Sequence, residues 1–233
     1  MLTLHQTKPK PMAKTLRVLA ALLGYPGAQL RADLPEMAEL LATEAALAPS
    51  RRAELDALML SLARTEALQA ESDYVELFDR GRATSLHLFE HVHGDSRERG
   101  PAMIDLGQTY EKAGLVLAEG ELPDYLPAVL EFVSTQPARE ARAFLGEMSH
   151  IFNAIFGALQ HHGSAYASVL GALIELAGEK AQAITPPAEM PLDEAWAEPV
   201  VFDGCSSKGQ AKPGQPQPVH IVRKAHTAQG VAP

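Results

Sequence analysis

The chain has 233 residues, a net charge of −9 and one cysteine, Cys205, so it cannot form an intrachain disulfide and gives no sign of an oxidising compartment. It contains neither a signal peptide nor an apolar run near the roughly 18 residues of a membrane span, which predicts a cytoplasmic protein. Residues 12–184 carry −10 of the charge, a surface that disfavours nucleic acid and anionic lipid and attracts basic peptides.

Apolar residues recur at helical spacing from residue 12 to residue 184, and no segment alternates as a half-buried strand does. Glycine, proline and capping residues divide this stretch into separate elements. In chain order, helices are expected at about residues 12–23, 35–47, 50–62, 72–81, 86–90, 101–119, 123–133, 137–162 and 164–184. The sequence therefore predicts an all-α fold, a single helical bundle.

The ends of the chain differ in composition from its middle. Eight of the 17 prolines follow Ile184, and the segment that they occupy cannot bury enough apolar area to offset the entropy lost on ordering. We expect a flexible N-terminus at residues 1–11, a helical domain at 12–184 and a Pro/Gly-rich, largely disordered tail at 185–233.

One short motif suggests metal chemistry. His87, Glu90 and His91 fit the pattern H-x-x-E-H, in which a helix presents two imidazoles on one face to zinc and a glutamate acts as base. Such proteases also need a distal third ligand and a mixed α/β scaffold, which this chain does not visibly supply. We predict no metal site, and a zinc-dependent hydrolase remains an alternative.

The loop HVHGDSRERG, at residues 91–100, holds charges of both signs. A simpler interpretation than catalysis is a structural polar network that fastens this loop between two helices, joined by charges from the preceding helix end, among them Asp79 with Arg80 or Arg82. The predicted members are Asp79, Arg80, His91, His93, Asp95, Arg97 and Arg99.

Other active-site signatures are missing from the sequence. It has no G-x-x-x-x-G-K-[ST], G-x-G-x-x-G, G-x-S-x-G or C-x-x-C pattern, so nucleotide-binding, hydrolase and dithiol functions lack support. We therefore predict that the protein is not an enzyme and needs no cofactor of its own.

Residues 74–106, YVELFDRGRATSLHLFEHVHGDSRERGPAMIDL, resemble the signature of NarJ-type chaperones for respiratory nitrate reductase. Tyr74, Leu77 and Phe78 also fit the Y-x-x-L-F pattern of the wider family of chaperones for molybdenum enzymes, which includes the TorD and DmsD types. This resemblance covers most of residues 12–184.

A second motif supports the resemblance. Glu121, Pro123 and Asp124 match the E-x-P-D-H turn of that family, with Tyr125 where many relatives have histidine. Any role that relatives assign to this histidine is therefore not carried over.

The resemblance implies a TorD-like helical fold and a partner, the apo nitrate reductase α (catalytic) subunit, whose N-terminal peptide is bound. It further implies support for molybdenum cofactor insertion before membrane attachment, without stable membrane association of the chaperone itself. A helical scaffold subunit that remains in a finished complex is the second alternative.

A groove between amphipathic helices can hold the apolar face of a peptide while acidic groups at its rim meet basic residues. The candidate peptide-binding residues are Tyr74, Leu77, Phe78, Glu121, Asp124 and Tyr125. The aromatic residues among them could equally be ordinary core, and the acids a solvated turn.

Overall fold

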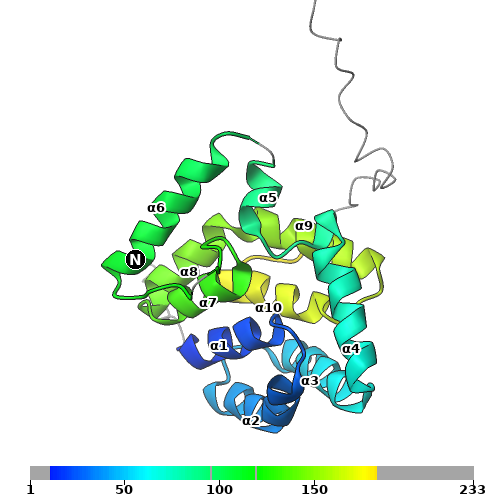
Figure 1. Cartoon of the computed structure of the whole chain (residues 1–233). Coiled ribbons are helices and arrows are strands. Elements are labelled where there is room, and N and C mark those ends of the chain that lie inside the picture. Colours follow the sequence, from blue (N-terminus) through cyan, green and yellow to red (C-terminus); the bar gives the residue numbers. More distant parts are fainter. Residues whose placement is uncertain (1–10, 95, 119, 183–233) are drawn as a thin grey trace, which may run out of the picture. The chain divides into compact units, whose positions relative to one another are not determined.

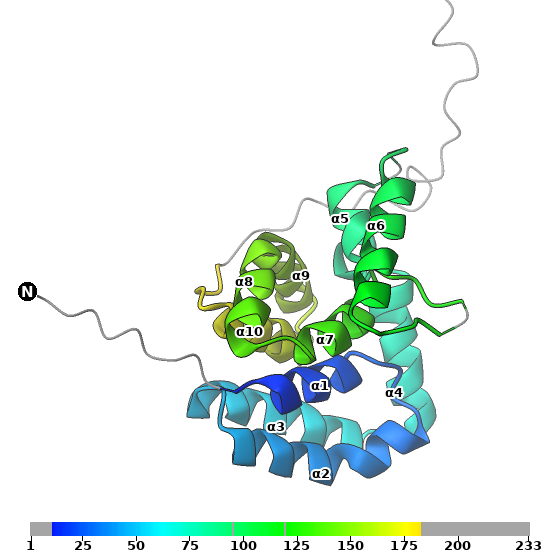
Figure 2. The same cartoon turned by 90° about the vertical axis from the view of Figure 1, so that its left-hand side faces the viewer.

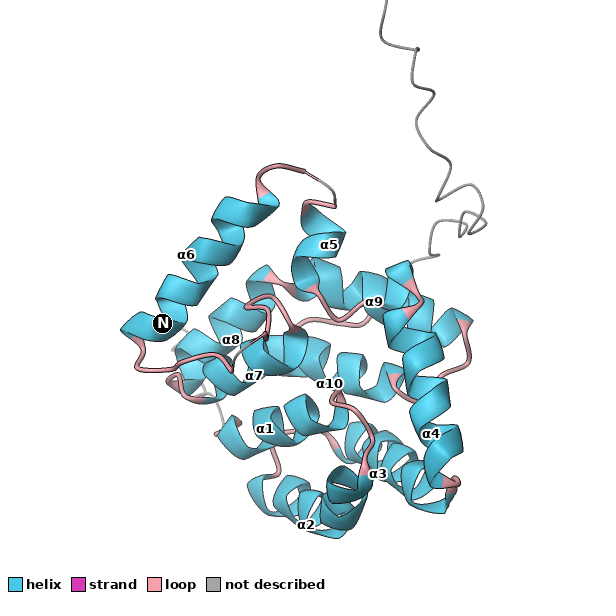
Figure 3. Cartoon of the chain, viewed as in Figure 1, coloured by secondary structure: helices cyan, strands magenta, loops and turns pink. Residues whose placement is uncertain are grey.

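The computed structural model describes residues 11–94, 96–118 and 120–182. Within these ranges the regular structure is helical, apart from one isolated antiparallel bridge between His87 and Tyr125 (Figure 3). In chain order the elements are α1 (Ala13–Leu22), α2 (Ala28–Glu44), α3 (Pro49–Arg64), α4 (Ala67–Tyr74), the π-helix η1 (Val75–Asp79), the 3-10 helix η2 (Arg82–Thr84), α5 (Leu88–Val92), α6 (Arg99–Lys112), α7 (Leu126–Ser134), α8 (Ala138–Glu147), α9 (Ser149–His161) and α10 (Ala167–Ala177). The predicted all-α fold is confirmed.

Two helices carry much of the core. α1 packs against α2 and α7, while α10 packs against α3, α8 and α9 (Figures 1 and 2). Every residue of α10 except Glu175 is buried, as expected for a helix that is apolar around its whole circumference. The core extends from Met12 to Ala177, inside the predicted helical domain, whereas residues 1–10 and 183–233 lie outside the described ranges.

The helix predicted at residues 137–162 is two helices in the structure. Met148, with φ −92° and ψ 0°, separates α8 from α9. Gly146 favours an ending here because glycine has a low helix propensity, and His150 Nδ1 lies 3.1 Å from the carbonyl oxygen of Glu147, which its ring can satisfy. The apolar stripe continues in phase across the break, so periodicity alone does not reveal it.

Several predicted helix ends move by a turn or more. α2 begins at Ala28, which places Pro35 inside this helix rather than at its start. α10 ends before residue 184 because Gly178 adopts a left-handed conformation, φ 88°, that favours glycine. α7 begins at Leu126, since the residues just before it pair with the segment that precedes α5.

Candidate functional site

The Y-x-x-L-F residues lie where α4 widens into the π-helix η1. Tyr74 and Phe78 are each 5% exposed, with ring centroids 4.9 Å apart, while Leu77 is half-buried against the core. The hydroxyl of the buried Thr84, in η2, donates to the carbonyl oxygen of Leu77. This bond ties η2 to η1 and fixes the orientation of the turn that carries Phe78.

A short pairing of two distant segments forms the opposite side of the site. The amide of Leu126 donates to the carbonyl of Leu86 at 2.8 Å, and the amide of Leu88 donates to the carbonyl of Asp124 at 3.0 Å. Together they hold His87 beside Tyr125, with ring centroids 5.4 Å apart.

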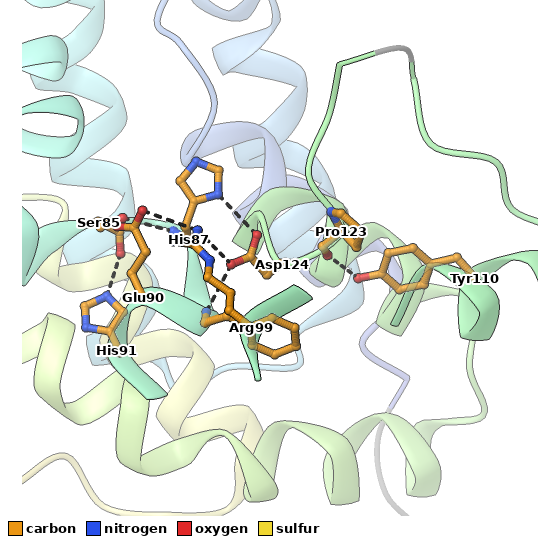
Figure 4. A network of polar contacts seen from close by, with 9 residues as sticks. Ser85, His87, Glu90, His91, Arg99, Tyr110, Pro123 and Asp124 are labelled. Carbon is orange, nitrogen blue, oxygen red and sulfur yellow. Dashed lines mark hydrogen bonds and ion pairs between the residues drawn. The ribbon is translucent and has the colours of Figure 1, made fainter. Parts of the chain in front are cut away.

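The carboxylate of Asp124 is the centre of the polar network in Figure 4. Its Oδ2 accepts the amide of Phe89 at 3.1 Å, and its Oδ1 lies 3.4 Å from His87 Nδ1. Arg99 Nη2, from the first turn of α6, lies 3.8 Å from Oδ2. Because His87 makes no capping bond at the start of α5, the Asp124 carboxylate caps this helix from outside.

Burial corrects one sequence-based expectation. Asp124 was expected among the acidic rim groups of the peptide groove, but its side chain is fully buried and satisfied by the groups around it. Its place inside the fold follows from the crossing of residues 86–88 over the turn. Glu121, three residues earlier, is exposed and can act as a rim acid.

Electrostatics in this network act chiefly on His87. The hydrogen bond to Asp124 raises the pKa of the His87 imidazole above its usual value, although partial burial opposes the rise. The protonated ring is favoured because its positive charge faces a buried carboxylate.

The other predicted network residues separate into two groups. Arg99 Nη2 lies 3.4 Å from Glu90 Oε1, His91 Nε2 lies 2.8 Å from the carbonyl oxygen of Ser85, and the ring of His93 stands edge-on to Phe89. These contacts fasten the segment around α5, as Figure 4 shows for His91 and Arg99.

The remaining predicted members do not join the Asp124 centre. Arg80 pairs with Glu76 at 2.9 Å on the surface, rather than with Asp79. Arg97 is exposed, and Asp95 lies outside the described residues.

The structure contradicts the geometry that the zinc hypothesis requires. His87 precedes α5 with φ −87° and ψ 103°, so its ring does not share a helical face with His91. The two rings bond to different groups, Asp124 and the carbonyl of Ser85. Among the described residues, no cluster of three or more His, Cys, Asp or Glu could hold a metal ion.

An open pocket of about 580 Å³ lies between η1, the end of α1 and the 120–125 turn. Its lining consists of Tyr25, Tyr74, Phe78, Asp79, Leu86, His87, Gly120, Glu121, Leu122 and Tyr125. The pocket thus brings together four of the six predicted binding residues and leaves out Leu77 and Asp124.

Sequence reasoning missed three apolar lining residues, Tyr25, Leu86 and Leu122. Tyr25 and Leu122 are 53% and 44% exposed, unusual for large apolar side chains. For Tyr25 and Leu122 the available signal was position, since each lies in a predicted turn where an apolar residue has no helical face to bury. Leu86 gave no such signal, because it begins the helix predicted at residues 86–90.

The tyrosines of the pocket are linked by contacts at their rings and hydroxyls. Tyr74 stands edge-on to Tyr25, with centroids 5.7 Å apart, and its hydroxyl donates to the carbonyl oxygen of Leu23 at 2.7 Å. The hydroxyl of Tyr125 lies 3.4 Å from that of Tyr74. Burial raises the pKa of the Tyr74 phenol, which therefore keeps its proton at neutral pH.

None of the helices in the described ranges has the length and apolar character needed to cross a membrane.

The sequence is similar to a known protein family. Residues 28–171 match the family model described as the nitrate reductase delta subunit. The chain is 39% identical over 196 residues to the nitrate reductase molybdenum cofactor assembly chaperone NarJ of Escherichia coli K12, an alignment that covers 78% of this chain and 82% of that protein. NarW of the same strain, provisionally assigned the same role, is 41% identical over 170 residues, which are 70% of this chain and 68% of NarW.

A solved structure shares the fold. The crystal structure of an Archaeoglobus fulgidus protein, provisionally described as a redox enzyme maturation protein, matches with a TM-score of 0.52 at 18% sequence identity. The match covers 76% of this chain and 99% of the other.

Proposed function

Because the chain belongs to the nitrate reductase delta subunit family, we propose that it is a cytoplasmic chaperone that binds the N-terminal peptide of the apo nitrate reductase α subunit. By holding this peptide it supports insertion of the molybdenum cofactor before the enzyme attaches to the membrane. The role is that of an assembly chaperone rather than an enzyme, as the relatives' description indicates.

The observation that carries the proposal is the composition of the pocket. Exposed apolar side chains, Tyr25 and Leu122, lie beside two exposed carboxylates, those of Asp79 and Glu121. An amphipathic peptide can bury its apolar face against such a surface, while its basic residues meet the acids at the rim.

Calorimetric titration of the full chain with a synthetic peptide of the α subunit's N-terminus tests the proposal. Leu122→Ala removes an exposed leucine from the pocket lining, whereas Leu60→Ala removes one of similar exposure from α3, outside it. We expect Leu122→Ala to weaken binding by about 1 kcal/mol or more, roughly fivefold, and Leu60→Ala to leave it unchanged. Equal affinities for both variants would place the peptide elsewhere.

A scaffold that stays in the finished complex is the second candidate, which the family description as a subunit favours. Recovery of the chain with its partners from cells blocked in molybdenum cofactor synthesis separates the two. A chaperone is recovered with the immature, cofactor-free subunit, whereas a scaffold is found in stoichiometric amounts with the mature enzyme.

A further inference from the structure

We propose that the pocket selects a cationic hydrogen-bond donor of its ligand, an ammonium or a guanidinium group, and that Tyr125 sets this preference by presenting its hydroxyl only as an acceptor. The inference rests on the proposed peptide-binding function and adds the chemistry of the group that the pocket recognises.

The direction of the hydroxyl hydrogen bonds follows from the fixed partner of Tyr74. A phenol carries one proton, and that of Tyr74 is directed to the carbonyl oxygen of Leu23, which lies 2.7 Å away and can only accept. The Tyr74 oxygen also lies 3.4 Å from the Tyr125 oxygen. Since Tyr74 has no second proton, Tyr125 must be the donor in this contact.

The consequence for the pocket is a hydroxyl of fixed polarity. Tyr125 directs its proton toward Tyr74, so its free lone pairs are what it offers a ligand. Burial raises the pKa of the Tyr125 phenol. The hydrogen bond with Tyr74 opposes this rise, the negative charges of Glu121 and Asp79 add to it, and the proton is retained at neutral pH. A ligand donor therefore meets a free lone pair of this oxygen, whereas a ligand acceptor would have to replace Tyr74 in the 3.4 Å contact.

The charged groups around Tyr125 have the same preference. Asp79 and Glu121 both line the pocket, and their ionised carboxylates are acceptors only. The described lining includes no lysine or arginine. His87 is the exception, because Asp124, 3.4 Å away, raises the pKa of its imidazole and the protonated ring can only donate. A cationic donor satisfies the Tyr125 oxygen and both carboxylates, whereas an anion or a pure acceptor satisfies none of these three groups.

The test is a double-mutant cycle between the chain and its peptide. The probe is a synthetic peptide of the α subunit's N-terminus in three forms: unchanged, with citrulline for arginine and norleucine for lysine, and with an acetylated amino terminus. Tyr125→Phe should lower the affinity for the unchanged peptide about tenfold, because a hydrogen bond to a charged group is lost. Against the form that lacks the recognised cation, the same substitution should have less than about a twofold effect. If Tyr125→Phe loses its effect with the citrulline and norleucine peptide, a side chain is recognised. If it loses its effect with the acetylated peptide, the terminal ammonium is recognised.

Two controls keep the result clear. Phenylalanine retains the ring that contacts His87, and circular dichroism establishes whether the variant folds. If it does not, Asp79→Asn at the exposed end of η1 replaces it, with Asp105→Asn, an equal change of charge on α6 outside the pocket, as its match. Only the Asp79 variant should lose its preference for the cationic peptide.

Equal losses for all three peptides, or no loss for any, would overturn the inference and leave peptide binding itself intact. Failure of the native chain to bind any of the three would overturn the proposed function together with this inference.

Discussion

Asp124 and Glu121 stand three residues apart in one turn, yet their surroundings give them opposite roles. Asp124 is fully buried against the amide of Phe89 and the imidazole of His87, whereas Glu121 is exposed at the pocket. A buried carboxylate that caps a helix stabilises the fold, and an exposed one acts on approaching charges.

Replacing each acid by its amide separates these roles. Asp124→Asn should lower the free energy of unfolding by about 1–3 kcal/mol, because the amides and cations around it lose a charged acceptor. Glu121→Gln should change it by no more than about 0.5 kcal/mol, as surface substitutions do. Urea unfolding followed by circular dichroism measures both. Equal stabilities would show that Asp124 is not the centre of the network.

His87 should make stability depend on pH. The Asp124 carboxylate raises the pKa of its imidazole in the folded chain, so the protonated ring stabilises the fold. This contribution is complete below the unfolded value of about 6.5 and is lost as the pH rises through the raised pKa.

The free energy of unfolding, measured in urea between about pH 6 and pH 9, should therefore fall with pH more steeply in the native chain than in His87→Gln. Asp124→Asn should flatten the curve in the same way, since it removes the cause of the shift. A native curve that coincides with both variants would contradict the assignment.

At the scale of single residues, sequence spacing predicted part of the candidate site. Tyr74 and Phe78 share a helical face because they are four residues apart, and this is local information. The contact of Tyr25 with Tyr74 depends instead on how the end of α1 packs near α4, which no local pattern encodes. Burial of Asp124 likewise depends on a segment far away in the sequence.

At the scale of the elements, η1 and η2 approach each other closely at Gly81. A Cβ on Gly81 would lie 2.7 Å from the carbonyl oxygen of Leu77 and closer still to the hydroxyl of Thr84. Only glycine allows the chain to approach its own π-turn in this way, and this explains its place between the Y-x-x-L-F residues and η2.

Gly81→Ala should therefore lower the free energy of unfolding by about 1–3 kcal/mol through overpacking. It should also weaken peptide binding, since Phe78 and Asp79 of η1 line the pocket. Gly107→Ala, in the interior of α6, is the matched control. There a Cβ would meet only Pro123, at 3.9 Å, and we expect a gain of up to about 1 kcal/mol. Thermal unfolding and peptide titration of both variants check the opposite signs, and a neutral Gly81→Ala would show that the turn has room to relax.

The sequence predicted helices well and their caps poorly. Helices follow from apolar spacing, but the N-cap residues of α1 and α5, Met12 and His87, make no side-chain capping bond. Glu44, at the end of α2, accepts the amides of Lys14 and Thr15, as Asp124 does for α5. Caps supplied by distant carboxylates arise from packing, so a search for local capping residues does not find them.

At the scale of the whole molecule, the net charge of −9 should speed the approach of a basic peptide. The acids that line the pocket should matter more than the rest, because exposed charges farther apart than a Debye length of about 8–10 Å are largely screened at physiological salt. Charge then acts on association, and apolar contact on dissociation.

Two double variants with equal change of charge test this division. Asp79→Asn with Glu121→Gln neutralises two acids of the pocket, and Glu36→Gln with Asp105→Asn neutralises two exposed acids outside it, so each takes the net charge from −9 to −7. Surface plasmon resonance across a salt series should show slower association and a flatter salt dependence for the pocket pair alone. Leu122→Ala should instead speed dissociation, because it removes apolar contact and no charge. If both double variants slow association equally, the acidic surface as a whole guides the peptide, and the pocket acids have no special part in its capture.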